Sequence, residues 1–123
     1  MSKTILIIDD DSAMRDSLSA YFKGKGYIVS EASSGKTGVA LIKEEKPDAV
    51  LLDIMMPEMN GIDVIKEVAA GTPEMLSHIT LMTNSSNMKF LSDAVDLGVF
   101  KYILKAEMSL EHVFKIVEGN LGK

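Results

Sequence analysis

Short apolar runs and helical periodicities alternate along the whole chain. The apolar runs predict strands, which fall at residues 4–8, 27–32, 49–52, 79–83 and 100–104. After each run, apolar side chains recur every three or four positions, and this spacing predicts helices at residues 12–23, 34–45, 61–70, 87 or 88–97, and 110–121. Gly and Pro residues punctuate the segments between them, so the predicted connections are short.

This alternation of strands and helices predicts the fold class. Parallel strands need crossover connections, and a helix after every strand supplies them, so we expect an α/β fold with helices on both faces of one open sheet. The predicted architecture is a doubly wound, flavodoxin-like three-layer sandwich of five parallel strands in the order 2-1-3-4-5. One domain is expected over residues 1–123, with an ordered core at about 3–121. In this strand order, ligands bind at the carboxyl ends of strands one and three, where the chain changes direction.

Composition excludes several classes of protein. With a net charge of −5, the chain lacks the surplus of Lys and Arg that nucleic acid binding requires. No apolar run approaches the length of a membrane span, and the absence of Cys leaves neither disulfides nor thiolate metal sites. We therefore expect a cytoplasmic protein without nucleic acid or membrane partners.

Carboxylates stand at the ends of two predicted strands. Asp9, Asp10 and Asp11 follow the first strand directly, and Asp53 ends the third. Because these strands are expected to be neighbours, the carboxylates of Asp9, Asp10 and Asp53 converge and repel one another, which a hard divalent cation such as Mg²⁺ offsets. Thr83 and Lys105 end the fourth and fifth strands with a hydroxyl and a cation. Such a set can hold a phosphoryl group on Asp53.

With these residues in place, the chain resembles the receiver domains of two-component response regulators, of the single-domain, CheY-like kind. The resemblance covers residues 3–121. The matching positions are the pair Asp9 and Asp10, Asp53 with Met56, Pro57 and Gly61 after it, Thr83, Tyr102 and Lys105. Each motif is weak alone, but the order and spacing of the whole set are specific.

The resemblance implies a role for each of these residues. Asp53 would be the phosphoacceptor, and Thr83 and Lys105 would bind the phosphoryl group. Asp10 and Asp53 would ligate Mg²⁺ directly, with Mn²⁺ as a possible substitute. The Met55 main-chain carbonyl would be a further ligand, and Asp9 would act largely through water.

The resemblance also implies a function and partners. The protein would take a phosphoryl group from a sensor histidine kinase or a histidine phosphotransfer protein, and would catalyse only its own phosphorylation and dephosphorylation. Thr83 and Tyr102 would then change the surface presented to a downstream protein. No output domain is expected, and the protein would be a monomer or a weak phosphorylation-dependent dimer. The alternative is a receiver fold that acts as an interaction module without phosphorylation.

Two enzyme classes are disfavoured by single positions. Gly35, Lys36 and Thr37 resemble the end of a phosphate-binding P-loop, but Ser30 stands where that motif needs its first Gly. A phosphohydrolase of the haloacid dehalogenase type would use Asp9 and Asp11, but Ala13 replaces the hydroxyl residue that it requires. Helix capping remains open as the role of Asp11 or Ser12.

The chain departs from the family at one place next to the expected site. Ala106 follows Lys105, where the family usually has a proline with a cis bond before it. A cis bond before any other residue costs about 2.5 to 4 kcal/mol, so we predict a trans bond, an altered loop at 105–109, and a Lys105 ammonium that still reaches Asp53. In this family two further positions help to set the access of water to the phosphoryl group, and by the resemblance they are Met55 and Ser85 here.

Overall fold

The computed structural model describes residues 2–84 and 88–121 of the chain. One sheet runs through it, formed by β1 (Thr4–Ile8), β2 (Ile28–Ala32), β3 (Ala49–Asp53), β4 (Ile79–Thr83) and β5 (Lys101–Leu104). All described strand pairs are parallel, and the strand order is β2-β1-β3-β4-β5. The predicted fold class and strand order are therefore confirmed.

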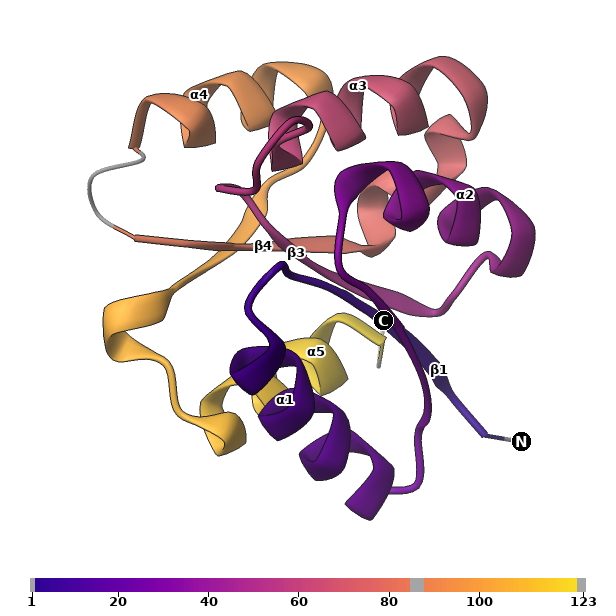
Figure 1. Ribbon diagram of the computed structural model, residues 1–123, viewed down its shortest axis with the longest axis vertical. Helices are drawn as coiled ribbons and strands as arrows, with labels where there is room; N and C mark the ends of the chain where they lie inside the picture. The colour runs from indigo at the N-terminus through magenta and orange to yellow at the C-terminus, as the bar shows by residue number, and fades with distance from the viewer. Residues whose placement is uncertain (1, 85–87, 122–123) are drawn as a thin grey trace.

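Helices cover both faces of the sheet, as Figure 1 shows. The helices are α1 (Ser12–Gly24), α2 (Gly35–Glu45), α3 (Gly61–Gly71), α4 (Met88–Leu97) and α5 (Leu110–Leu121). In the view of Figure 1, α2, α3 and α4 lie above the sheet, and α1 and α5 lie below it. Each face has its own apolar core, because alternate strand residues point to opposite faces.

The central strands explain the apolar runs of the sequence. Every residue of β3 and of β4 is buried, because these strands are covered by helices on both faces. The edge strand β2 is different, with exposed and half-buried positions along most of its length. Burial on both faces thus produces continuous apolar runs only in the middle of the sheet.

The boundaries differ from the predicted ones in small ways. The strands β2 and β5 begin one residue later than predicted, β3 includes Asp53, and α3 extends to Gly71. Two short 3₁₀ helices were not predicted, namely η1 (Pro73–His78) and η3 (Lys105–Glu107). Helix α4 begins at Met88, and the alternative start at Asn87 lies outside the described residues.

Candidate functional site

The register of the sheet brings the predicted acidic residues together. Ile8 pairs with Leu52, so Asp9 emerges beside Asp53 at the carboxyl edge of the sheet. One carboxylate oxygen from each of Asp9, Asp10 and Asp53 lies within 4.8 Å of the other two. Asp9 and Asp53 are buried, whereas Asp10 is exposed. Hard oxygen donors at this spacing are the ligand type that Mg²⁺ prefers.

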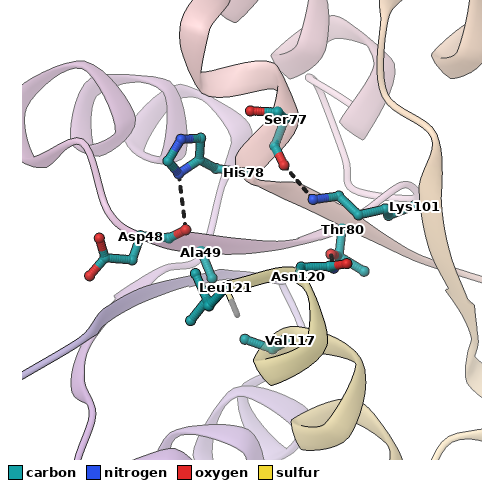
Figure 2. Close-up of a pocket in the computed structure, with 9 residues that line it drawn as sticks. All are labelled: Asp48, Ala49, Ser77, His78, Thr80, Lys101, Val117, Asn120 and Leu121. Atoms are coloured by element: carbon teal, nitrogen blue, oxygen red, sulfur yellow. Dashed lines mark hydrogen bonds between the residues drawn. The ribbon is translucent and has the colours of Figure 1, made fainter. Parts of the chain in front are cut away.

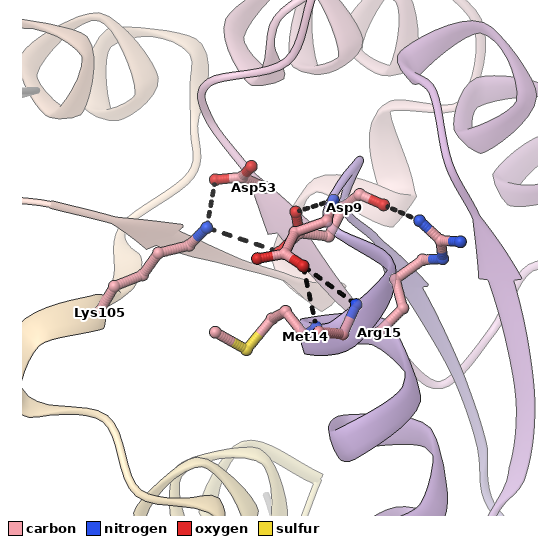
Figure 3. A network of polar contacts seen from close by, with 7 residues as sticks. Asp9, Met14, Arg15, Asp53 and Lys105 are labelled. Atoms are coloured by element: carbon pink, nitrogen blue, oxygen red, sulfur yellow. Dashed lines mark hydrogen bonds and ion pairs between the residues drawn. The ribbon is translucent and has the colours of Figure 1, made fainter.

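Lys105 supplies the positive charge of the site. Its ammonium nitrogen lies 3.1 Å from Oδ1 of Asp53 and 3.5 Å from Oδ2 of Asp9, as Figure 3 shows. The peptide bond between Lys105 and Ala106 is trans, and Lys105 opens the short helix η3. Both predictions for this position, the trans bond and the contact with Asp53, are confirmed.

Burial and the neighbouring charges together set the protonation of this ion pair. Burial first, and the neighbouring Asp9 carboxylate second, raise the pKa of Asp53 to about 6, although Lys105 acts in the opposite direction. For Lys105, burial disfavours the ammonium, but the hydrogen bond and charge of Asp53, followed by those of Asp9, outweigh it and raise the pKa. Lys105 is therefore charged at neutral pH, and Asp53 is ionised above about pH 6.

Asp9 is held by three further groups, two on its main chain and one on its carboxylate. The Asp9 amide donates to the Ala32 carbonyl at 3.1 Å, and Oδ1 of Asp9 accepts from the Asp11 amide at 3.0 Å. The Arg15 guanidinium donates to the Asp9 main-chain carbonyl at 2.7 Å. Sequence reasoning did not identify Arg15, because nothing in the sequence distinguishes it from a solvated cation on the first turns of a helix.

Asp11 has a structural role. Its side chain caps α1 by accepting hydrogen bonds from the amides of Ala13 and Met14 at 3.0 and 3.3 Å. This answers the question that the sequence left open between Asp11 and Ser12. It also places the Asp11 carboxylate outside the acidic cluster, which removes the second acid that a haloacid dehalogenase would need.

The P-loop resemblance is explained in the same way. Ser34 caps α2, since its hydroxyl accepts from the Thr37 amide at 3.3 Å. A Cβ atom added to Gly35 would lie 2.8 Å from the Met59 carbonyl oxygen, so close packing requires this glycine. The motif therefore starts a helix in the expected place without forming a phosphate loop.

Gly61 lets the loop after Asp53 close tightly. A Cβ atom at Gly61 would lie 2.8 Å from both the Asp53 carbonyl oxygen and the Ile54 Cα. The Gly61 amide donates to the Ile54 carbonyl at 2.7 Å, and Asn60 caps α3 directly before it. The segment between Asp53 and α3 is thus a compact turn, in which Met55 is half exposed at the rim.

Thr83 and Tyr102 are on neighbouring strands but have different surroundings. Thr83 is buried, and its hydroxyl donates to the Asn84 main-chain carbonyl at 3.1 Å rather than to an acidic side chain. Tyr102 is 47% exposed, on a surface that also presents Phe100 and Val95. Ser85, the second predicted position for water access, lies outside the described residues.

A cavity of about 570 Å³ lies at the opposite edge of the sheet, where β4 and β5 begin (Figure 2). Its two basic side chains already have main-chain partners: His78 Nδ1 contacts the Asp48 carbonyl at 2.9 Å, and Lys101 donates to the Ser77 carbonyl. Burial lowers the pKa of Lys101. This cavity lies at the opposite ends of the strands from Asp53, and its lining includes no residue of the acidic cluster.

Comparison with known proteins places the chain in a family. The model of the response regulator receiver domain matches residues 5–118, and the chain belongs to this family. Receiver domains act in two-component signalling and are generally signalling modules rather than enzymes. The predicted family is therefore confirmed.

Individual relatives differ in length. The chain is 38% identical to the chemotaxis protein CheY of Thermotoga maritima over 106 residues, which cover 85% of this chain and 87% of that protein. It is 37% identical to the regulatory protein AtoC of Escherichia coli, covering 82% of this chain but only 22% of AtoC. It is 29% identical to the DNA-binding response regulator MtrA of Mycobacterium tuberculosis, covering 94% of this chain and 50% of MtrA. The chain thus spans most of CheY but half or less of the other two proteins.

Solved structures show the same architecture. A CheY-like response regulator receiver domain protein of Methanospirillum hungatei superimposes with a TM-score of 0.89 at 25% identity, covering 99% of this chain and 95% of that chain. A receiver domain protein of Clostridium thermocellum superimposes with a TM-score of 0.87 at 24% identity, covering 98% of this chain and 94% of that chain.

Within the described residues, no helix has the length and apolar character needed to cross a membrane.

Proposed function

We propose that this protein is a phosphorylation-activated response regulator in which Asp53 accepts a phosphoryl group from a phosphohistidine. The observation that carries the proposal is the pairing of Asp53 with Lys105 inside a cluster of three carboxylates. A carboxylate oxygen of Asp53 attacks phosphorus, the bond between phosphorus and the histidine nitrogen breaks, and that nitrogen recovers a proton. Positioning and electrostatics account for such catalysis.

The acidic residues fit a hard divalent cation. Asp10 and Asp53 would bind Mg²⁺ directly, the Met55 main-chain carbonyl would add a ligand, and Asp9 would contribute through water. Mn²⁺ has the same preference for oxygen and would substitute. When bound, the cation offsets the negative charge of the carboxylates and of the incoming phosphoryl group.

Lys105 and Thr83 would distinguish the phosphorylated from the free protein. Phosphorylation adds a charge of about −1.5 to −2 and new acceptor oxygens at Asp53. The Lys105 ammonium is already within 3.1 Å of Asp53, so it can pair with such an oxygen after a small shift. The Thr83 hydroxyl is bonded to the Asn84 carbonyl and would exchange this partner for the phosphoryl group. Because these contacts exist only in one state, they can shift a conformational equilibrium.

Another protein would recognise this shift at the surface formed by α4, β5 and α5. Thr83 in β4 pairs with Leu104 in β5, and Tyr102 lies two residues before Leu104 on the same strand. A movement of Thr83 toward the phosphoryl group would free space for the half-exposed Tyr102 ring. Response regulators work with histidine kinases and downstream targets, and we propose such partners here.

The test is direct phosphorylation in vitro. The protein is incubated with a small phosphodonor, with Mg²⁺ or with a chelator, and its intact mass is measured. We expect the mass of one phosphoryl group to appear only with Mg²⁺. No mass gain under any of these conditions would favour the alternative function, a receiver fold that signals by binding alone.

A further inference from the structure

Arg15 joins the acidic end of β1 to the edge strand of the sheet. One guanidinium nitrogen donates to the Asp9 main-chain carbonyl at 2.7 Å. The Nε atom of the same side chain lies 3.5 Å from a carboxylate oxygen of Glu31, in β2. The Arg15 side chain is 17% exposed and is thus largely packed in place between these partners. A guanidinium can serve both directions at once because its donors form a rigid planar fork.

The three carboxylates of the cluster are not held in the same way. Asp53 is held by Lys105, and the Asp9 carboxylate is held by Lys105 and by the Asp11 amide. The exposed Asp10 carboxylate makes no hydrogen bond or ion pair with any described residue. The place of the Asp10 side chain therefore depends on the orientation of its main chain.

Arg15 fixes that orientation. The carbonyl that accepts its hydrogen bond belongs to the peptide unit between Asp9 and Asp10, so the bond sets the plane from which Asp10 projects. On the other side of Asp9, the amide is tied to the Ala32 carbonyl. The Asp9 main chain is thus tied to the edge strand β2 by its amide, and the peptide that leads into Asp10 is held by the Arg15 side chain.

From this geometry we propose that Arg15, held by Glu31, is a positioning residue that preorganises Asp10 for binding a divalent cation. The proposal rests on the metal site proposed above, and it adds an element outside the ligand set. Groups that orient ligands in this way typically contribute about 10- to 100-fold to metal affinity or activity.

The direction in which Mg²⁺ affinity changes on removal of Arg15 distinguishes positioning from a simple effect of its charge. Arg15 is a cation close to a site for another cation, so its removal should strengthen Mg²⁺ binding if charge alone mattered. Positioning predicts the opposite, because an unrestrained Asp9 to Asp10 peptide must be ordered at the moment of binding. Glu31 neutralises the guanidinium, which reduces the direct repulsion and leaves positioning as the larger effect.

The experiment measures Mg²⁺ and Mn²⁺ affinity by calorimetry, without any phosphodonor. We expect Arg15→Met to weaken binding about tenfold. Arg15→Lys keeps the charge and a single donor, and should recover part of this loss. Lys23→Met removes an exposed cation from the last turn of the same helix and should leave the affinity unchanged or slightly higher. Unchanged or tighter binding by Arg15→Met would overturn the proposal.

A double variant tests whether the effect passes through Asp10. Asp10→Asn weakens binding by itself, and adding Arg15→Met should then cost little more, since the group that Arg15 positions has already been altered. Independent, fully additive losses would contradict positioning. Thermal unfolding of each metal-free variant checks the fold. If Arg15→Met does not fold, Arg15→Lys and Glu31→Gln carry the test, and wild-type affinity in both would overturn the proposal.

The outcome is independent of phosphorylation. Metal affinity that depends on Arg15 supports the inference even if Asp53 accepts no phosphoryl group, which would refute only the proposed function. Conversely, normal phosphorylation with metal affinity insensitive to Arg15 would refute only the inference.

Discussion

The strands of the sheet end at its carboxyl edge and begin at its amino edge. At the carboxyl edge, Lys105 pairs with two carboxylates, whereas at the amino edge Lys101 and His78 contact main-chain carbonyls. Both edges place a partly buried lysine at one end of β5. The amino edge has the cavity of about 570 Å³, and the carboxyl edge has the excess of like charge.

Under the function proposed above, charge rather than cavity volume distinguishes the functional edge of the sheet. At the amino edge, basic side chains complete the hydrogen bonding of η1 and of the chain leading into β3, which is a structural role. At the carboxyl edge, three carboxylates lie together and only two of them pair with Lys105, while burial raises the pKa of Asp53 to about 6. Repulsion among clustered carboxylates destabilises the fold, so such a cluster points to a ligand that offsets the repulsion.

The largest expected difference between the edges is in phosphorylation. Asp53→Asn should abolish acid-labile, hydroxylamine-sensitive labelling by a small phosphodonor with Mg²⁺, because an amide cannot act as the nucleophile. Lys101→Met at the amino edge should label like the wild-type protein. Intact-mass measurements of both variants check this, and undiminished labelling of Asp53→Asn would reject Asp53 as the acceptor.

Within the carboxyl edge, Mg²⁺ affinity should depend on the residues of the acidic cluster and much less on the residues at its rim. We expect Asp10→Ala to weaken Mg²⁺ binding by at least about tenfold, since it removes a ligand. Glu58→Ala alters a rim residue that lies outside the acidic cluster and should have a much smaller effect. Calorimetric titration of the two variants decides the matter, and equal affinities would contradict the assigned ligand set.

Stability should change in opposite directions at the two edges. The pKa of Asp53 is raised from 3.8 to about 6, so the folded state binds this proton more tightly, and the free energy of unfolding falls as the pH rises from about 4 to about 6. In the absence of metal, Asp53→Asn should therefore stabilise the protein at pH 8 by about 1 to 3 kcal/mol, and this gain should fade below about pH 4.

At the amino edge, the matched change removes a satisfied contact. Lys101→Met leaves the Ser77 carbonyl without its donor and should lower the free energy of unfolding by up to about 1 kcal/mol. Urea denaturation at pH 8 and pH 4 compares the two variants. A loss of stability in Asp53→Asn at pH 8 would show that the lost pairing with Lys105 outweighs the relief of charge repulsion.

The smallest expected effect is at the rim of the site. Met55 is half exposed beside Asp53 and cannot orient water through a strong hydrogen bond. Met55→Ala should open a path for water and speed loss of the phosphoryl group by about two- to threefold, which corresponds to less than about 0.7 kcal/mol of activation free energy. The decay of the labelled protein is followed by intact mass, and a slower decay in the variant would reject this role.

Much of the fold could be predicted because local patterns and tertiary environment agree. The apolar run of β3 and the mostly apolar sequence of β4 reflect burial on both faces, and the caps at Asp11, Ser34 and Asn60 mark helix starts within one residue. The short helices η1 and η3 were missed because they carry no apolar periodicity long enough to detect.

The sequence by itself determined which strands end in carboxylates, a hydroxyl and an ammonium, and the parallel topology was enough to predict that these ends converge. Only the tertiary structure decided which of these groups contact one another. Strand register and helix packing place Lys105 between Asp53 and Asp9, give Asp11 a capping role, and bring Arg15 to the Asp9 carbonyl and Glu31. Periodicity reports only which face of an element is buried, whereas a specific polar contact depends on how three or more elements are placed relative to one another.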